Sequence, residues 1–536
     1  MKQIVLLFLI QFTVIYLSAN EFINSDYDNY YNYLELIEEV ESSYLSFRAY
    51  SNNDWIQIKE GIDNPWSKRT AKNRRILSKT NWNLQLLDSE LFLSYNSTYA
   101  DGYNDGAMWQ GRGFNTRISG GVSFQSEYFS ASFAPEFWIA ENKNFNIVPS
   151  SISNPNGYYF SGIDYPQIFG NSLYYDFSFG QSDIRFNYKA FTVGLSTENF
   201  TIGPSEYNQL LMSCNASGFP HLDIGFNTIN TKTGLWELRF FWGILNESDF
   251  FDEINSNDQT FITGFSFSYS FPFLKNLTLG GNRVIQTPFE LVDGWSLLTV
   301  IDFTDKGFGT YFGFGTSYGY DNLDQKLSLT ADWKFPVVGF NIYFEYFRED
   351  YTKIRNLALI PEHTMGYVIG AKKSIPISTK RGFLITAEMV GMQQSRDYEL
   401  YLGIGGTYYT HHINTHGYTH KGQILGTPVG PGGDGQFLTI DYYDSWGRVG
   451  LFGTRIRNNM DYVYKTAYYD SGFNPRTDSY RDIIDVEIKA GFDCVVFVGP
   501  VDLFGTIAVA GRLNTNYIPS NDILNFYGNL GVRYRH

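Results

Sequence analysis

Cysteine and positive charge are both scarce in this chain, and each scarcity excludes a class of protein. Only Cys214 and Cys494 occur among 536 residues. Two thiols cannot form a disulfide framework or a zinc site by themselves, so they are either one disulfide or, as we favour, two buried small residues. Lys+Arg number 40 against Asp+Glu 55, a net charge of −15. This balance excludes nucleic acid as a partner, and it excludes electrostatic capture of an acidic polymer by the whole surface.

Long apolar runs are missing after the first 19 residues, so the sequence predicts no transmembrane helix, which needs about 18 or more apolar residues. The N-terminus itself reads "MKQIVLLFLIQFTVIYLSAN". Lys2 precedes an apolar stretch from Ile4 to Leu17, and small residues follow at Ser18 and Ala19. This pattern predicts a secretory signal peptide over residues 1–19 rather than an uncleaved anchor.

Aromatic residues and glycine are abundant, with 46 Phe, 41 Tyr, 10 Trp and 51 Gly. This enrichment favours strands with tight bends. Stretches such as "FSFSYSF" (265–271), "WELRFFWGI" (236–244) and "LSLTADWKF" (327–335) alternate aromatic or apolar residues with polar ones. In a soluble sandwich the apolar face would meet a second sheet, and in an outer-membrane barrel it would meet lipid.

The C-terminus favours the barrel. In "LNFYGNLGVRYRH", Leu524, Phe526, Leu530, Val532 and Tyr534 share one face of a strand that reaches almost to His536, as expected of a strand that closes a barrel. About 415 residues follow position 120, which at roughly 23 residues per strand gives about 18 strands. The predicted fold class is an all-β transmembrane barrel of about 18 antiparallel strands.

Residues 20–92 have a different pattern. In "DYDNYYNYLELIEEVESSYLSFRAY" (26–50), apolar residues recur every three or four positions, which predicts an amphipathic helix, and "NPWSKRTAKNRRILSK" (64–79) is a second helix candidate. We therefore predict three parts: the signal peptide (1–19), a small periplasmic α-helical region (20–92), and an outer-membrane barrel with plugging loops (93–536).

Two stretches resemble ligand-binding motifs in their spacing but lack the residues that those motifs need. "GPGGDG" (430–435) satisfies a dinucleotide-binding spacing, but Pro431 removes a backbone donor and no helical pattern follows. "DGYNDG" (101–106) resembles a calcium loop, but Tyr103 occupies a ligand position and Arg112 stands where the bidentate Glu belongs. With no catalytic motif either, we predict a non-enzymatic protein with no cofactor.

Four of the seven histidines lie in "YYTHHINTHGYTHKGQ" (408–423), at His411, His412, His416 and His420. Along a strand, His412, His416 and His420 would be about 13 Å apart from neighbour to neighbour, too far to share one ion unless a turn at Gly417 folds them together. The favoured interpretation is a polar loop or lumen face without a metal.

Three stretches resemble the capsule assembly protein Wzi family of outer-membrane proteins. They are "YNDGAMWQGRGFNTRISGGVSF" (103–124), "GQSDIRFNYKAFTVGLSTENFTIGPSEYNQLLMSCNASGFPHLDIGF" (180–226) and "YTHKGQILGTPVGPGGDGQF" (418–437). The resemblance spans nearly the whole mature chain and is most specific over 180–226. It implies a barrel with a largely blocked lumen and a periplasmic helical bundle, acting as a lectin that attaches capsular or related polysaccharide.

Within these motifs we predict residues that either bind polysaccharide or form a lumen network that holds the plug, the second role being favoured for each. Rings stack on sugar C–H faces, and amide and charged groups bond hydroxyls. These residues are Asp105, Trp109, Gln110, Arg112, Asn115, Glu198, Asn199, Asn208, Asn215, His221, His420 and Gln423. Structural turns are predicted at Gly106, Gly111, Gly113, Gly203 and Pro204.

The sequence-based hypothesis is a monomeric outer-membrane polysaccharide anchor whose partners are capsular or other surface polysaccharide and membrane lipid. The alternatives are a porin or oligosaccharide channel and, as a third, a carbohydrate-active enzyme. The net charge leaves one question open, because many capsules are anionic. Binding then needs a local basic patch, a bridging divalent cation or a neutral polymer.

Overall fold

The computed structural model describes the greater part of the chain. The described residues are 26–42, 44–49, 56–58, 66, 77–79, 81–150, 155–160, 162–274, 276–292, 323–349, 362, 364–378, 380–395, 407–466 and 483–536. The predicted signal peptide lies outside them.

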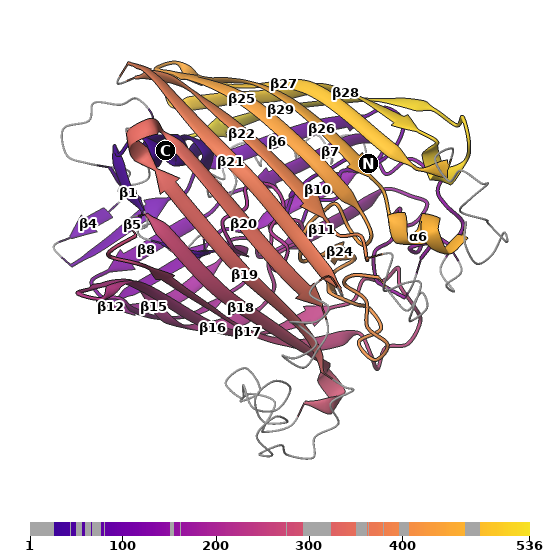
Figure 1. Cartoon of the computed structure of the whole chain (residues 1–536), viewed down its shortest axis with the longest axis horizontal. Coiled ribbons are helices and arrows are strands. Elements are labelled where there is room, and N and C mark those ends of the chain that lie inside the picture. Colours follow the sequence, from indigo (N-terminus) through magenta and orange to yellow (C-terminus); the bar gives the residue numbers. More distant parts are fainter. Residues whose placement is uncertain are drawn as a thin grey trace, which may run out of the picture.

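One large antiparallel sheet forms the wall of a barrel (Figure 1). Four of its strands are broken in two: β5 (Trp82–Leu86) with β6 (Ser89–Asn96), β7 (Gly113–Ser119) with β8 (Val122–Ser126), β9 (Phe129–Phe133) with β10 (Glu136–Ala140), and β11 (Tyr174–Ser178) with β12 (Asp183–Tyr188). Fourteen are continuous: β13 (Phe191–Ser196), β15 (His221–Thr231), β16 (Gly234–Asn246), β17 (Gln259–Ser270), β18 (Leu277–Pro288), β19 (Asp324–Phe335), β20 (Phe340–Glu349), β21 (Met365–Ser378), β22 (Arg381–Gly391), β25 (Asp434–Asp444), β26 (Gly447–Arg457), β27 (Val486–Val498), β28 (Val501–Leu513) and β29 (Ile523–Tyr534).

The barrel closes where the C-terminal strand meets the first one. β29 pairs antiparallel with β6, from Tyr527 opposite Asn96 to Tyr534 opposite Ser89. Within the described residues the wall therefore has 18 strand positions, four broken and fourteen continuous. The predicted barrel of about 18 antiparallel strands is confirmed.

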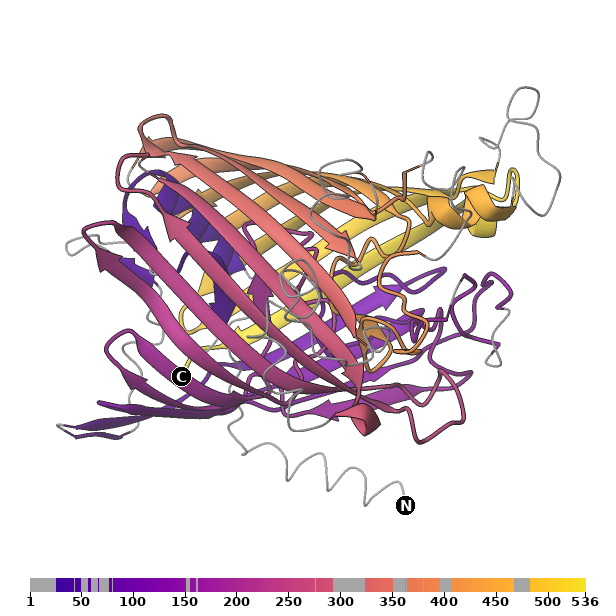
Figure 2. The same ribbon diagram turned by 60° about the horizontal axis from the view of Figure 1, so that its bottom comes forward.

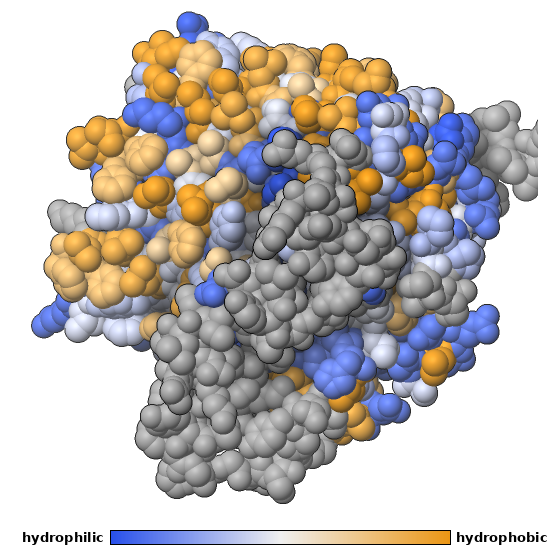
Figure 3. Space-filling view, turned by 45° about the vertical axis from the view of Figure 1, so that its right-hand side comes forward, coloured by the Kyte–Doolittle hydropathy of each residue, from blue (hydrophilic) through white to orange (hydrophobic). Residues whose placement is uncertain are grey.

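Alternation in the sequence decides which way each strand faces. In β16, Trp236, Leu238 and Phe240 lie on the outer, partly exposed face, whereas Glu237 and Arg239 are buried inside. In β29, Leu524 is 69% exposed and Asn525 is 0% exposed. Apolar outside and polar inside is the arrangement of a membrane barrel and the reverse of a soluble one. Figure 3 shows hydrophobic residues gathered over much of the visible wall.

The four broken strands are interrupted at the same level of the wall. The breaks fall near Leu87, Gly121, Ala134 and Gly180, which meet through the Leu87 N–H to Gly121 carbonyl hydrogen bond of 3.1 Å and a bridge between Ala134 and Gly180. At Gly121 a Cβ atom would lie 1.9 Å from the Phe133 carbonyl oxygen, so only glycine fits.

The two ends of the barrel differ (Figures 1 and 2). At the short-turn end, two-residue connections occur at 189–190, 232–233, 445–446 and 499–500. At the long-loop end, the connections include 97–112, 141–173, 197–220 and 392–433. Two of these carry short strands of their own, β14 (Phe200–Ile202), β23 (Thr419–His420) and β24 (Gln423–Ile424).

Long loops fold back into the barrel and fill it. We call the described parts of the connections 197–220 and 392–433 the plug. β23 pairs with β24, and β14 pairs with β2 (Phe47–Ala49) from the N-terminal segment. Together with inward side chains of the wall they bury an apolar core that includes Leu210, Tyr409 and Tyr418.

One plug turn also contributes to the wall. Beside the long-loop end, β11 pairs with β10, and the turn at Lys421 lies between β11 and β16. The Lys421 N–H donates to the Asn246 carbonyl at 2.8 Å, and its ammonium lies 2.8 Å from the Asp176 carboxylate of β11.

The N-terminal segment covers the short-turn end. Helix α2 (Asp26–Leu36) presents Tyr30 and Tyr33 to Tyr443, and Trp66 stacks on Tyr30 with ring centroids 4.5 Å apart. The Trp66 Nε1–H donates to the Asp444 carbonyl at 3.1 Å. Three further short strands accompany it: β1 (Val40–Ser42), β3 (Ile56–Ile58) and β4 (Leu77–Lys79).

The predicted periplasmic region differs in its details. α2 is the one helix described before Trp82, and the wall already begins at β5, ahead of the predicted boundary at residue 93. The second helix candidate (64–79) lies mostly outside the described residues, and its described end, Leu77–Lys79, is strand β4. The pairing of β4 with β5 overrides the helical pattern there.

The other helical elements are α6 (Met460–Lys465) and three 3-10 turns, η5 (Phe289–Leu291), η9 (Pro336–Val338) and η12 (Thr515–Tyr517). In the part of the chain that the structure describes, no helix has the length and apolar character to cross a membrane.

Candidate functional site

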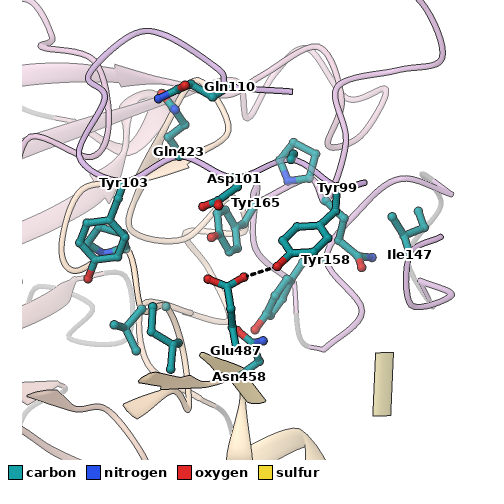
Figure 4. A pocket seen from close by; sticks show the side chains of 18 of the residues that line it. Tyr99, Asp101, Tyr103, Gln110, Ile147, Tyr158, Tyr165, Gln423, Asn458 and Glu487 are labelled. Atoms are coloured by element: carbon teal, nitrogen blue, oxygen red, sulfur yellow. Dashed lines mark hydrogen bonds between the residues drawn. The ribbon is translucent and has the colours of Figure 1, made fainter. Parts of the chain in front are cut away.

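A cavity of about 260 Å³ lies under the long loops, between the plug and the wall strands β26 to β28 (Figure 4). Rings and polar groups line it together. The aromatic members are Tyr99, Tyr103, Trp109, Phe145, Tyr158, Tyr159 and Tyr165. The charged and amide members are Asp101, Asp105, Gln110, Asn146, Gln167, Asn215, Gln423, Asn458, Asn459, Glu487, Lys489, Arg512 and Asn516.

The loop between β6 and β7 forms one side of the cavity. It is held in shape by its own hydrogen bonds: the Asp105 carboxylate accepts from the Tyr103 N–H at 2.7 Å, and the Asp101 N–H donates to the Gln110 carbonyl at 3.2 Å. Gly106 turns the chain with φ +65°. Burial raises the pKa of Asp105 to about 6.

The loop between β10 and β11 supplies three of the five tyrosines of the lining. The rings of Tyr158 and Tyr159 lie 4.6 Å apart, and Tyr165 lies 5.5 Å from Tyr158. Trp109 reaches the same loop, where its ring meets Phe169 at 4.9 Å and its Nε1–H donates to Asn142 at 3.1 Å. These fixed ring faces are suited to contact with the C–H faces of sugars.

Charged groups close the cavity from the wall side. The Lys489 ammonium pairs with Asp101 and lies 3.5 Å from Glu487. The Tyr99 hydroxyl donates to Glu487 at 2.8 Å, as Figure 4 shows. Arg512 donates Nε and Nη2 to Asp485 at 2.7 and 2.8 Å. Each cation of the lining therefore meets a carboxylate.

Wall carboxylates hold the plug in place. Glu388 of β22 accepts from the Glu206 N–H at 2.7 Å, from Asn208 Nδ2 at 2.8 Å and from the Tyr343 hydroxyl at 2.7 Å. Glu237, Glu345 and Glu349 likewise accept backbone N–H groups, from Phe47, Leu210 and Tyr409 respectively. Buried carboxylates need such donors, and buried loop N–H groups need such acceptors.

A buried cluster of charges lies toward the short-turn end. Arg185 binds Asp223 through both terminal nitrogens, at 2.8 and 2.7 Å, and it lies 3.3 Å from Glu198 of the plug. Arg239 binds the other side of Asp223. The cluster joins β12, β15 and β16 to the plug, and all four groups are almost fully buried.

Five of the predicted site residues meet at the cavity, although they come from three separate loops. They are Asp105, Trp109, Gln110, Asn215 and Gln423. The Asn215 amide donates to the Ile424 carbonyl at 2.9 Å, and Gln110 accepts from the Tyr527 hydroxyl at 3.3 Å. Gln423 is thereby placed beside residues that precede it by more than 200 positions.

The other predicted residues make contacts inside the barrel. Asn208 joins Glu388 to the Thr427 hydroxyl, which donates to it at 2.7 Å. Asn199 accepts from Gln181 Nε2 at 2.9 Å and donates to the Ala216 carbonyl at 2.8 Å.

Asn115 donates to the carbonyls of Gly111 and Gly113, at 3.0 and 3.3 Å. His221 bonds the Phe219 carbonyl at 2.8 Å.

Arg112 and Glu198 do not share a network. The Arg112 guanidinium donates to the carbonyls of Ser97 and Asn144, at 3.2 and 2.6 Å, whereas Glu198 meets Arg185.

Turn positions need glycine for two reasons. Gly106, Gly113 and Gly203 have φ of +65°, +98° and +110°, a region open mainly to glycine. At Gly111 a Cβ would lie 3.1 Å from the Asn142 Cα. Pro204 follows Gly203 at the entry of the plug segment that Glu388 holds.

The clustered histidines are spread through the plug. His420 accepts from the Asn246 N–H at 2.9 Å, His416 bonds Thr260, and the rings of His411 and His412 stand 4.5 Å apart. Burial lowers the pKa of His416 to about 4 and that of His420 to about 3. Among the described residues no group of three or more His, Cys, Asp or Glu side chains has the geometry of a metal site.

Cys214 is buried in the plug and Cys494 lies on β27, and no disulfide joins these two described residues. Burial raises the pKa of the Cys214 thiol to about 12.

Sequence reasoning missed the tyrosines of the β10–β11 loop and the wall carboxylates. The stretch "GYYFSGIDY" (157–165) carries a signal in its three tyrosines, a composition typical of a binding loop. Glu237, Glu345, Glu349 and Glu388 carry only the weaker signal of inward position on an alternating strand.

No protein-family model matches the chain, and no curated protein does either. Among solved structures it is similar to Wzi of Escherichia coli, an outer-membrane protein involved in Group 1 capsule assembly and described as a carbohydrate-binding β-barrel. The TM-score is 0.59 at 12% identity, over 97% of this chain and 100% of that one.

Two more distant structures also match. OccK2 of Pseudomonas aeruginosa has a TM-score of 0.39 at 8% identity, over 85% of this chain and 96% of that one. A mutant porin of Rh. blastica has 0.32 at 10%, over 84% and 99%. The resemblance predicted from the three motifs is confirmed at the level of the fold: this chain is a membrane β-barrel with the fold of Wzi.

Proposed function

We propose that this protein is a non-enzymatic polysaccharide-binding barrel of the outer membrane that helps to assemble or anchor capsular or exopolysaccharide at the cell surface. The observation that carries the proposal is the cavity under the long loops, where seven aromatic rings stand among amides and carboxylates. Such a lining offers stacking surfaces for sugar rings and hydrogen-bond partners for hydroxyls.

The fold supports the same function. The E. coli protein with this fold is described as carbohydrate-binding and as taking part in capsule assembly. The apolar outer face suits the lipid of an outer membrane, and the predicted signal peptide would deliver the chain there. In this function the protein acts as a monomer and needs no cofactor.

The test compares cell-attached with shed polysaccharide, by carbohydrate assay, in the source bacterium with and without the gene. We expect the total to stay constant while polymer moves from the cells to the medium. Complementation with Trp109→Ala should restore less attachment than the wild-type gene, whereas Trp236→Ala, on the outer face of β16, should restore it fully. Unchanged attachment after deletion would contradict the proposal.

A porin or oligosaccharide channel is the second candidate, because an 18-strand barrel is wide enough for an aqueous channel. Conductance of the purified protein in planar bilayers separates the two. A steady open-pore current supports the channel, whereas a closed membrane supports the plugged anchor. Incubation of the polymer with the protein, followed by size analysis, tests the third possibility of an enzyme, which requires the polymer to shorten.

A further inference from the structure

The charged side chains of the cavity, and the hydrogen bonds that its donors and acceptors already make, indicate which kind of polysaccharide it binds. Three carboxylates of the lining, Asp101, Asp105 and Glu487, accompany two cations, Lys489 and Arg512. Arg512 is bound by a further carboxylate, Asp485, through two hydrogen bonds. Four carboxyl groups therefore surround two cations, and the cavity holds more acidic side chains than basic ones.

Both cations of the lining, the indole of Trp109 and four of its asparagines, with Asn215 from the plug among them, already donate to groups of the protein itself. The pairs are Lys489 with Asp101, Arg512 with Asp485, Trp109 with Asn142, Asn215 with the Ile424 carbonyl, Asn458 with Asp485, Asn459 with Tyr158 and Asn516 with the Asn146 carbonyl.

In contrast, at least one carboxylate of the lining can still accept a hydrogen bond from a ligand. The carboxylate of Asp101 is 9% exposed and points into the cavity in Figure 4. Lys489 bonds its Oδ1 atom, and its buried Oδ2 atom accepts no hydrogen bond of good geometry from a described residue, although the side chain of Asn525 also interacts with the carboxylate. A buried carboxylate oxygen without a donor is costly, so a ligand that brings a hydroxyl or amine hydrogen is favoured there.

We propose that the cavity takes an uncharged, hydroxyl-rich stretch of polysaccharide and rejects acidic chains such as polyuronates. The inference rests on the proposed function and assigns its ligand class. A uronate carboxylate would meet Asp101 and Glu487 at close range and would find no unengaged cation in the lining, and like charges brought together in a partly desolvated site are strongly repelled. Neutral sugars meet the same acceptors with their hydroxyl groups and the same rings with their C–H faces.

The experiment uses the full-length protein in detergent and the surface polysaccharide of the source bacterium, separated by anion exchange into neutral and acidic fractions. Binding of each fraction is measured by biolayer interferometry with and without EDTA. We expect the neutral fraction to bind on the order of tenfold more tightly than the acidic one. Preferential binding of the acidic fraction overturns the inference, and its loss in EDTA would identify a bridging divalent cation instead.

A double variant tests the residues. Asp101→Asn with Glu487→Gln leaves Lys489 without its two carboxylates, so the acidic fraction should gain affinity on the order of tenfold while the neutral fraction loses affinity. Glu253→Gln, which removes an exposed carboxylate of the β16–β17 loop outside the cavity, is the matched control and should change neither. An acidic fraction that binds the double variant no better than the wild type contradicts the assignment.

The outcomes separate this inference from the proposed function. If neither fraction binds, polysaccharide binding itself fails and the inference fails with it. If the acidic fraction binds more tightly, the proposed function stands and the ligand class is wrong. Circular dichroism and heat modifiability on gels confirm that each variant is folded.

Discussion

The two halves of the barrel use the same residue types for opposite purposes. In the short-turn half, rings face one another, as in the stack of Trp66 on Tyr30, and cations meet carboxylates in one buried cluster around Asp223. In the long-loop half, rings face a cavity, and carboxylates outnumber cations there. The comparison teaches that aromatic content alone does not mark a binding site; in the long-loop half the rings also line a cavity, beside more carboxyl groups than cations.

The largest effect should come from breaking the charge cluster of the short-turn half. Arg185→Met leaves Asp223 and Glu198 buried with one cation fewer, which should lower the free energy of unfolding by about 3–5 kcal/mol. Thermal unfolding followed by gel shift measures this. Arg381→Met, at a 57% exposed side chain of the same half, is the control. Equal melting of both variants would show that the cluster does not support the barrel.

A smaller effect is expected where the plug meets the wall between the two halves. Glu388→Gln replaces an acceptor oxygen by a donor, so one of its N–H or hydroxyl partners loses its hydrogen bond, at a cost of about 1–3 kcal/mol. We expect a lower melting temperature and intermittent current in planar bilayers. Glu290→Gln, at an exposed 3-10 turn, should leave the membrane as tight as the wild type does.

The long-loop half should respond to pH. Burial raises the pKa of Asp164 and of Asp461 to about 7, from 3.8. Between these values Asp164 and Asp461 retain protons in the folded protein that the unfolded chain releases, so the contribution of these two carboxyls to stability should fall as pH rises from about 4 to 7. Asp461→Asn should flatten this dependence in melting curves measured at several pH values. A slope identical to that of the wild type would show that Asp461 does not titrate there.

The smallest effect on stability is expected at Lys421, in the plug turn that lies in the wall between β11 and β16. Lys421→Met removes the ion pair with Asp176, whose side chains are 40% and 34% exposed. Partly exposed pairs of this kind contribute about 0–1 kcal/mol, so we expect a shift in melting temperature close to the error of the measurement. The backbone bond from the Lys421 N–H to Asn246 remains. A large loss of stability would mean that the ammonium, rather than the backbone, seals the wall.

The wall could be predicted from the sequence because its information is local. A period of two over Trp236, Leu238 and Phe240 is enough to assign a strand and its outer face, and the length then gives the number of strands. The helical pattern before Trp82 was less reliable, because at Leu77–Lys79 pairing with β5 decides the structure instead.

The site could be predicted only in part, because it is built by contacts between residues that lie far apart in the sequence. The motif stretches contain Asp105, Trp109 and Gln423, but nothing in their spacing shows that Tyr158 lies beside them. Likewise the bond from Asn208 to Glu388 joins residues 180 positions apart. Such contacts depend on how loops fold inside a barrel that must first exist.

The turn at Lys421 has a consequence for how such a barrel could ever conduct. A plug that only filled the interior could leave the barrel without changing its wall. Here the plug also completes the wall, because the Lys421 backbone bonds Asn246 and the Lys421 side chain bonds Asp176. Moving the plug out would open a gap in the wall toward the bilayer as well as emptying the interior. The plug and the wall must therefore fold and insert into the membrane as one unit.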